Sequence, residues 1–351
     1  MSLEQTLKRI LPLDRSVEGA AQARLDALTK PPRSLGRLED WARHVCLIQG
    51  QVPPQLGPKV LYVFAADHGV TEEGVSAYPK DVTAQMTCNF LNGGAAINVL
   101  ARHHGVDIEI IDVGIDHDLT LLPGLRDYKV RRGTANFARG PAMGRAEALR
   151  SVELGIQLAQ EAAARRVFLV GAGDMGIGNT SSAAAVFCAL TGASPLDAAG
   201  RGTGIDDATF ARKVAAIEKG LAVNRPDPND PLDVLAKVGG LEIGAVTGVI
   251  LGAAARRMPM VLDGFISGAA ALLAQRLSPG VCEFLFASHL SAERGHASML
   301  RELGLAPLLN LSMRLGEGTG ACLAMGVLEA AVKVMREMAT FESAGVRERI
   351  A

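Results

Sequence analysis

The sequence predicts a doubly wound α/β fold with a mainly parallel sheet, from two observations. Short apolar runs rich in Val, Ile, Leu and Phe recur along the chain, and nearly continuous runs of this kind are typical of strands buried on both faces of a parallel sheet. Helical stretches, such as residues 146–164 and 243–257, fill the intervals, and such alternation indicates an α/β domain. Five runs are predicted strands: residues 60–66, 108–113, 167–170, 260–262 and 281–286.

Both ends of the chain are predicted to be helical. Residues 1–50 read as helices with a break at Lys30-Pro31-Pro32, and residues 320–340 form a long run rich in Ala, Met and Val. Because the termini of a domain often lie close together, we expect residues 1–50 and 320–351 to form a small helical lobe. Residues 51–319 would then be an α/β nucleotide-binding large domain.

Composition excludes several classes of partner. The 351 residues carry a net charge of −1 with no basic stripe, so no nucleic acid is expected. The longest apolar runs are too short to cross a bilayer, and residues 1–14 lack the apolar core of a signal peptide. The five cysteines show no paired spacing. We therefore expect a cytoplasmic protein without a membrane partner or structural zinc.

Polar groups and glycines follow nearly every predicted strand. They are Asp67-His68, Asp112-Val113-Gly114, the segment 171–182, Asp263-Gly264 and Ser288-His289. In doubly wound sheets the ligand crevice lies beyond the carboxyl ends of the strands. These loops are therefore expected to converge on one site, although turns are commonly polar without a ligand.

The segment 171–182 combines glycines with hydroxyl groups before an Ala-rich stretch. Gly171-x-Gly173-x-x-Gly176 fits a dinucleotide fingerprint, but the acid that should hold a ribose, Asp197, follows no apolar strand. Asn179, Thr180 and Ser181 suit helix capping or one phosphate. We therefore favour a mononucleotide phosphate site, with a capped turn that binds no ligand as the alternative.

A second glycine cluster, residues 315–321, precedes the last predicted helix. Glu317 lies between two glycines, so a substrate could approach its carboxylate closely. An acid at this place is also an ordinary complement to the helix dipole. In a closed apolar pocket the pKa of Glu317 would rise, and it could then act as a base near neutral pH.

Other chemistries have weaker support. Asp67-His68 is too small a set for a metal site, and neither a phosphate-binding P-loop nor a serine-hydrolase elbow is present. Residues 74–86 mix apolar, aromatic and amide groups that could line a pocket for a flat ring. The alternative is a loop that leads into a helix with Met86 in the core.

Taken together, these segments resemble the nicotinate-nucleotide:5,6-dimethylbenzimidazole phosphoribosyltransferase family of cobalamin assembly. The resemblance extends over nearly the whole chain. It is carried by residues 30–36, 66–70, 74–86, 92–97, 171–182, 202–204 with Lys213, 263–265 and 315–321.

The resemblance implies a fold and a reaction. The fold would be a Rossmann-like large domain with a small helical lobe, in a homodimer. The substrates would be nicotinate mononucleotide and dimethylbenzimidazole, and the phosphoribosyl group would be transferred with inversion at C1′. No cofactor or metal is implied, because the leaving nicotinate departs from a cationic pyridinium and no pyrophosphate forms. Adenine, another benzimidazole or a phenol stays open as the acceptor.

The resemblance also implies site residues. Glu317 would be the general base. Asp174, where many members carry Glu, would orient the donor or assist catalysis. The phosphate and the donor would be bound by Gly176, Gly178, Asn179, Thr180, Ser181, Gly202, Lys213, Asp263 and Ser291. The acceptor base would be bound by Ser76, Tyr78, Pro79, Gln85, Met86 and Leu315.

Two functions of other classes remain as alternatives on sequence grounds. A nucleotide-dependent oxidoreductase would use the glycine fingerprint for NAD, although the ribose-binding acid is missing. A non-catalytic nucleotide-sensing module would bind a ligand without turnover, which would leave Glu317 without a use.

Overall fold

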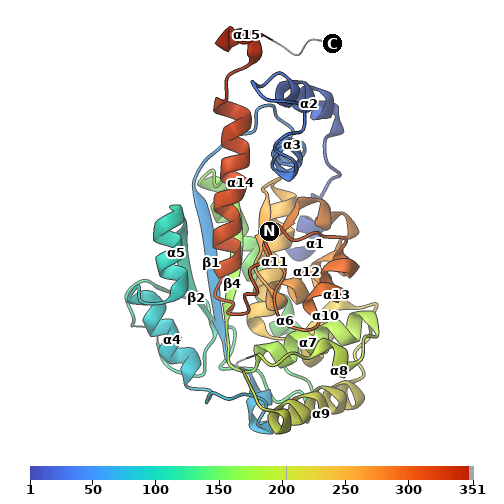
Figure 1. The fold of residues 1–351 in the computed structure, drawn as a ribbon. Coiled ribbons are helices and arrows are strands. Elements are labelled where there is room, and N and C mark those ends of the chain that lie inside the picture. The colour runs from blue at the N-terminus through green and yellow to red at the C-terminus, as the bar shows by residue number, and fades with distance from the viewer. Residues whose placement is uncertain (120, 203, 348–351) are drawn as a thin grey trace.

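A six-stranded sheet forms the centre of the molecule, and all of its strand pairs are parallel (Figure 1). The computed structural model describes residues 1–119, 121–202 and 204–347. The strand order is β3-β2-β1-β4-β5-β6, so the order reverses between β1 and β4, as in Rossmann folds. The predicted doubly wound α/β fold is confirmed. The strands are β1 (Lys59–Ala66), β2 (Asp107–Gly114), β3 (Leu125–Asp127), β4 (Leu169–Met175), β5 (Met260–Leu262) and β6 (Leu285–Ala287).

The structure corrects two sequence expectations about strands. Residues 281–284 belong to the 3-10 helix η3 (Pro279–Phe284), and β6 begins only at Leu285. In addition, β4 continues to Met175, so Gly171 and Gly173 lie within the strand and not in a turn. The edge strand β3 was not predicted, because its sequence, Leu-Arg-Asp, contains no apolar run.

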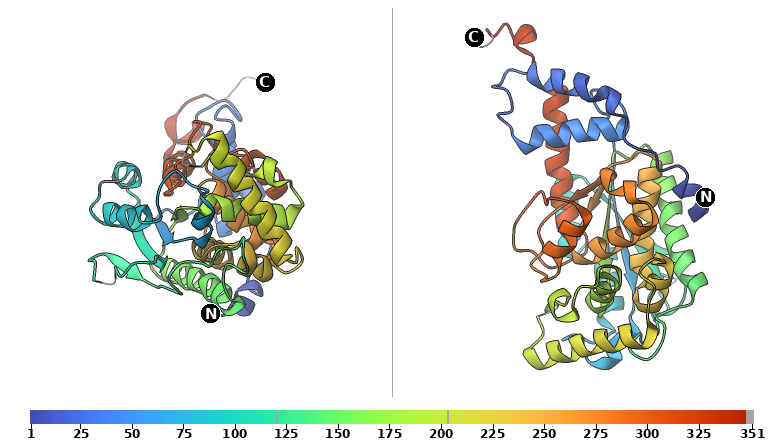
Figure 2. Two further views of the ribbon diagram at one scale, coloured as in Figure 1. Left: turned by 90° about the horizontal axis from the view of Figure 1, so that it is seen from below. Right: turned by 90° about the vertical axis from the view of Figure 1, so that its right-hand side faces the viewer.

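Helices cover both faces of the sheet (Figure 2). Those that pack on one face are α6 (Arg145–Ala164), α11 (Leu241–Ala255) and α12 (Phe265–Leu277). Those on the other are α4 (Val82–Leu91), α5 (Ala96–His104) and α14 (Thr319–Glu337). Glycines allow α6 and α11 to approach closely, since a Cβ atom at Gly155 would lie 1.9 Å from the Ala245 carbonyl oxygen.

The remaining elements connect these layers. They are α1 (Leu3–Leu7), η1 (Arg15–Val17), α2 (Glu18–Asp26), α3 (Arg37–Gln49), η2 (Gly69–Glu73), α7 (Asn179–Thr191), α8 (Pro195–Ala198), α9 (Asp207–Asn224), α10 (Pro231–Val238), α13 (His296–Leu303) and α15 (Phe341–Ala344). Within the described ranges, no helix is long and apolar enough to cross a membrane.

Two helices from the N-terminal part of the chain, α2 and α3, meet the C-terminal helix α14 beyond one end of the sheet (Figure 1). Helices α2 and α3 and the C-terminal half of α14 share a small apolar cluster, separate from the main core, that includes Leu25, Cys46 and Met335 (Figure 1). Helix α1 instead packs on α6 and α11. The domain boundaries near residues 50 and 320 stay a prediction, and residues 348–351 of the predicted lobe lie outside the described residues.

Candidate active site

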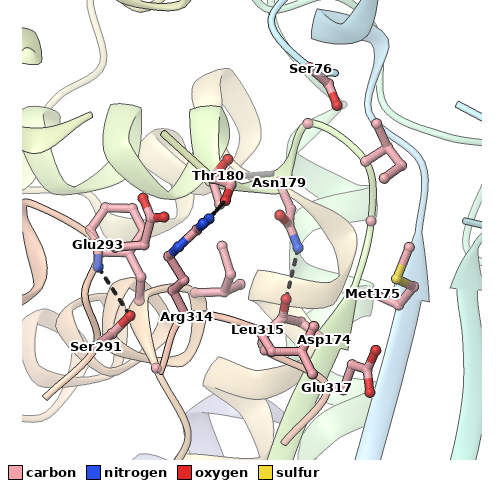
Figure 3. A pocket seen from close by; sticks show the side chains of 18 of the residues that line it. Ser76, Asp174, Met175, Asn179, Thr180, Ser291, Glu293, Arg314, Leu315 and Glu317 are labelled. Atoms are coloured by element: carbon pink, nitrogen blue, oxygen red, sulfur yellow. Dashed lines mark hydrogen bonds between the residues drawn. The ribbon is translucent and has the colours of Figure 1, made fainter. Parts of the chain in front are cut away.

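The loops that follow four strands enclose a cavity of about 650 Å³. Its walls come from residues 75–86 after β1, 174–180 after β4, 263–266 after β5 and 289–293 after β6. The turn before α14 closes it, and Figure 3 shows side chains from these segments facing a common space. The polar groups predicted at the ends of β4, β5 and β6 therefore converge on one site, whereas those after β1 and β2, Asp67-His68 and Asp112-Val113-Gly114, do not line it.

One end of the cavity is built to bind an anion. Gly178, with a left-handed φ of +95°, precedes the first turn of α7. The Lys213 ammonium on α9 donates hydrogen bonds to Thr180 Oγ1 (2.9 Å) and to the Gly200 carbonyl oxygen (3.0 Å). Burial lowers the pKa of Lys213 to about 8. A helix N-terminus and a buried lysine together suit a phosphate group.

A buried histidine supports the start of α7 from behind. His68 Nδ1 lies 3.0 Å from Ser182 Oγ in the first turn of α7, and His68 Nε2 lies 2.8 Å from Glu242 Oε1. A Cβ atom at Gly176 would come within 2.4 Å of the Ala66 carbonyl oxygen. The loop is thus fixed against β1, and a side chain at position 176 would push it away.

Glu317 lies at the other end of the cavity, in a turn where its backbone has a conformation that few residue types other than glycine adopt. Its φ is +62°, and Gly316 and Gly318 on either side both have φ of +86°. A left-handed backbone is unusual outside glycine and recurs at functional sites. The side chain is only 6% exposed, and burial raises its pKa. Within the described part of the chain, Glu317 Oε2 has no hydrogen-bond partner, so this oxygen can accept a hydrogen bond or a proton from a molecule in the cavity.

Asp263 holds the Glu317 turn in place. Its Oδ2 accepts a hydrogen bond from the Gly318 N–H (3.1 Å), and its Oδ1 accepts one from the Ala321 N–H (3.0 Å). Gly173 on β4 packs against the same turn, because a Cβ atom there would lie 2.2 Å from the Gly318 nitrogen. Gly173, the second glycine of the apparent fingerprint, therefore lacks a side chain so that the Glu317 turn can pack against β4.

Asp174 stands at the end of β4 between the two ends of the cavity. Its Oδ2 accepts a hydrogen bond from Asn179 Nδ2 at 2.8 Å (Figure 3). Burial, together with the nearby carboxylates of Asp263 and Glu242, raises its pKa well above the usual 3.8. A cationic ring beside Asp174 would stabilise the ionised form of its carboxyl group.

Most of the predicted site residues line this cavity, but three do not. Ser76, Tyr78, Met86 and Leu315 form a partly apolar wall, as expected for a flat ring. The structure places the other three outside the walls: Pro79 and Gln85 are exposed, and Ser181 is buried inside α7. On α4, Gln85 and its neighbour Met86 point in directions about 100° apart, and only Met86 lines the cavity.

Several residues that line the cavity were not predicted from the sequence, among them Arg201, Arg314 and Glu293. Arg314 Nη1 donates a hydrogen bond to the Gly202 carbonyl oxygen at 2.6 Å. His289, which was expected near the site because it follows a predicted strand, also lines the cavity. No local pattern marks Glu293. Among the described residues, no group of three or more His, Cys, Asp or Glu side chains could hold a metal ion.

Known proteins resemble this chain over nearly its whole length. A family model described as Phosphoribosyltransferase matches residues 10–346. Proteins from Geotalea uraniireducens and Geobacter sulfurreducens, both named nicotinate-nucleotide–dimethylbenzimidazole phosphoribosyltransferase, are 55% and 56% identical over 346 residues. Each alignment covers 99% of this chain and 98% of the relative.

A solved structure extends the similarity to three dimensions. The crystal structure of the enzyme of the same name from Thermus thermophilus superposes with a TM-score of 0.90 at 48% identity, covering 96% of this chain and 100% of that one. The resemblance expected from the sequence is confirmed. The chain belongs to the nicotinate-nucleotide–dimethylbenzimidazole phosphoribosyltransferase family.

Proposed function

We propose that this protein transfers the 5-phosphoribosyl group of nicotinate mononucleotide to 5,6-dimethylbenzimidazole, with inversion at C1′. The products would be α-ribazole 5′-phosphate and nicotinate, and the reaction would serve nucleotide loop assembly in cobalamin biosynthesis. One observation carries the proposal: Glu317, whose buried Oε2 has no hydrogen-bond partner among the described residues, lies in the same cavity as the phosphate-binding end formed by Gly178 and Lys213.

The donor would be bound at the end of the cavity with the cation. Its phosphate would lie against the start of α7 and Lys213, with Gly202 and Ser291 beside it. Its pyridinium ring would lie near Asp174, whose ionised form a positive charge favours. Nicotinate would leave from a cationic ring, so the leaving group needs no proton.

The acceptor would be bound between Tyr78, Met86 and Leu315, with its ring N–H toward Glu317. As the other ring nitrogen attacks C1′, the ring becomes cationic, and the N–H proton must be removed to restore a neutral ring. The raised pKa of Glu317 brings the base closer to neutral pH, where general-base catalysis is most effective. Attack on the face opposite the leaving nicotinate gives the α-linkage.

The decisive experiment is the Glu317→Gln variant with chromatography of the products. We expect the rate of α-ribazole 5′-phosphate formation to fall about 10²- to 10⁴-fold, the usual contribution of a positioned base. The matched control is Glu302→Gln, which removes a partly exposed carboxylate on α13 that does not line the cavity. Product formation close to normal in Glu317→Gln would contradict the assignment of the base.

The acceptor is the part of the proposal with a specific alternative. Adenine, another benzimidazole or a phenol would also fit a partly apolar wall, so turnover should be compared across such a panel. Retention of NAD through purification would favour an oxidoreductase, and donor binding without turnover of any acceptor would favour a sensing module.

We also propose that the protein is a cytoplasmic homodimer. Large hydrophobic side chains that remain exposed in the single chain, including Tyr78 and Leu315 at the cavity, support a second subunit at this face. Light scattering of the purified protein should give twice the mass of the 36.7 kDa chain. A monomeric mass at the concentrations used for assay would contradict the dimer.

A further inference from the structure

A buried carboxylate, that of Glu293, lies at the phosphate-binding end of the cavity and has no role in the proposed reaction. Glu293, in the loop between β6 and α13, lines the cavity and is only 6% exposed. Its Oε2 has no hydrogen-bond partner in the described residues. It packs directly on backbone, because a Cβ atom at Gly200 would lie 1.7 Å from Glu293 Oε2.

Glu293 is a neighbour of the phosphate-binding lysine. The Gly200 carbonyl oxygen, beside the Glu293 carboxylate, accepts a hydrogen bond from Lys213 Nζ at 3.0 Å. The negative charge of Glu293 also acts on the pKa of Lys213, against the effect of burial. A carboxylate in this position would repel a phosphate, so Glu293 is not a phosphate ligand.

The chemistry of a buried carboxylate calls for a hydrogen-bond donor. An oxygen left unpaired away from water is costly, and hydrogen bonds to an ionised acceptor are the stronger ones. Ser291 faces the same cavity, and its Oγ accepts the Glu293 N–H at 3.3 Å (Figure 3). The loop thus offers a carboxylate and a hydroxyl side by side, a pair that matches two adjacent hydroxyl groups.

We propose that Glu293 accepts hydrogen bonds from the 2′- and 3′-hydroxyl groups of the donor's ribose, and that it makes the enzyme select ribonucleotide over deoxyribonucleotide donors. The inference rests on the proposed function, in which the phosphate is bound at Lys213 and the sugar extends from there toward Glu317. Held at its phosphate and at its hydroxyl groups, the sugar presents C1′ in one orientation.

The test compares three donors, namely nicotinate mononucleotide and its 2′-deoxy and 3′-deoxy analogues, with dimethylbenzimidazole as acceptor. Because removal of a hydroxyl group also changes the intrinsic reactivity of C1′, the quantity compared is the ratio of kcat/KM values in each variant. We expect the wild-type preference for the ribonucleotide to shrink about 10- to 100-fold in Glu293→Ala, the range expected for a hydrogen bond to a charged group.

Two further variants make the result specific. Glu293→Gln keeps one acceptor oxygen in nearly the same volume and should retain part of the preference for the ribonucleotide donor. This variant also keeps the test valid if Glu293→Ala folds poorly. Glu302→Gln, which changes a partly exposed side chain on α13, should leave the ratio of kcat/KM values for the donors unchanged. Equilibrium titration with each donor alone, without acceptor, should show the same order of affinities.

Two outcomes have distinct meanings. If Glu293→Ala and Glu293→Gln change kcat/KM equally for all three donors, Glu293 acts only on the charge of Lys213, and the ribose assignment is overturned. If the wild-type protein turns over no nicotinate mononucleotide at all, the proposed function itself fails.

Discussion

The Asp263 carboxylate accepts the backbone N–H of Gly318 at 3.1 Å, one residue after the proposed base. Its second oxygen accepts the Ala321 N–H at 3.0 Å, so both oxygens are used by the start of α14. Asp263 lines the cavity, and its predicted role in binding the donor stays a prediction. Its hydrogen bonds add a second possible role, in which it positions the Glu317 turn.

Replacement of Asp263 by Asn should separate these two roles. The amide has one acceptor oxygen, so one N–H of the turn loses its partner, and we expect the free energy of unfolding to fall by about 1–3 kcal/mol. We expect kcat to fall at least about tenfold with little change in the donor KM. Asp197→Asn, at an exposed carboxylate on α8, is the control. A change confined to the donor KM would mean that Asp263 contacts the donor after all.

Two glycines of β4 provide a matched pair of substitutions. A Cβ atom at Gly173 would lie 2.2 Å from the Gly318 nitrogen, whereas one at Gly171 would mainly meet the flexible end of Met325, at 2.6 Å. Gly173→Ala should therefore displace the Glu317 turn and lower kcat by about 10²-fold or more, since misplacement by about 1 Å has effects of this size.

Gly171→Ala should be tolerated much better, because a methionine side chain can repack. Steady-state kinetics together with thermal unfolding of both variants checks this prediction. Equal losses of activity in the two variants would show that β4 responds as a whole and that Gly173 has no special relation to the turn.

The pKa of Lys213 predicts how donor use depends on pH. Burial lowers this pKa to about 8, so the ammonium group is charged below pH 8 and becomes neutral above it. We expect kcat/KM for nicotinate mononucleotide to fall as the pH rises through about 8, by up to about tenfold per pH unit. Nicotinate riboside, which lacks the phosphate, should not show this decline. A parallel decline with the riboside would assign the titration to another group.

Asp174 should affect stability in a pH-dependent way. Its pKa is raised well above 3.8 in the folded state, so the folded protein binds this proton more tightly than the unfolded chain does. The free energy of unfolding therefore decreases as pH rises through 3.8, and the decrease ends at the folded pKa. Asp174→Asn removes this effect and should unfold at a higher temperature than wild type at pH 7. The difference should shrink toward pH 4, and a constant difference would contradict the shift.

Much of the fold follows from local sequence because the long strands are buried on both faces. The predicted runs at residues 60–66 and 108–113 match β1 and β2 to within about one residue. β3 escaped prediction because three residues at a sheet edge need no apolar pattern. The order β3-β2-β1-β4-β5-β6 could not be predicted, since it depends on contacts between distant segments.

The candidate site was only partly predictable for a similar reason. Glu317 and Gly178 stand in glycine-rich segments, where an unusual backbone leaves a mark in the sequence. The roles of Gly173 and Asp263 come from contacts with the turn of α14, more than 50 residues further along for Asp263. Glu293 stands out only in the structure, where its Oε2 is buried with no hydrogen-bond partner among the residues described.

Helix α14 begins beside Glu317 and ends among the helices from the N-terminus. Its 19 residues form a stiff rod about 28 Å long. Because one helix connects the two regions, the distance of a residue from the cavity does not predict how strongly its substitution affects activity. A substitution near Leu25 or Cys46 that tilts the far end of α14 would shift the Glu317 carboxylate without touching the substrate, so residues remote from the cavity contribute to its alignment.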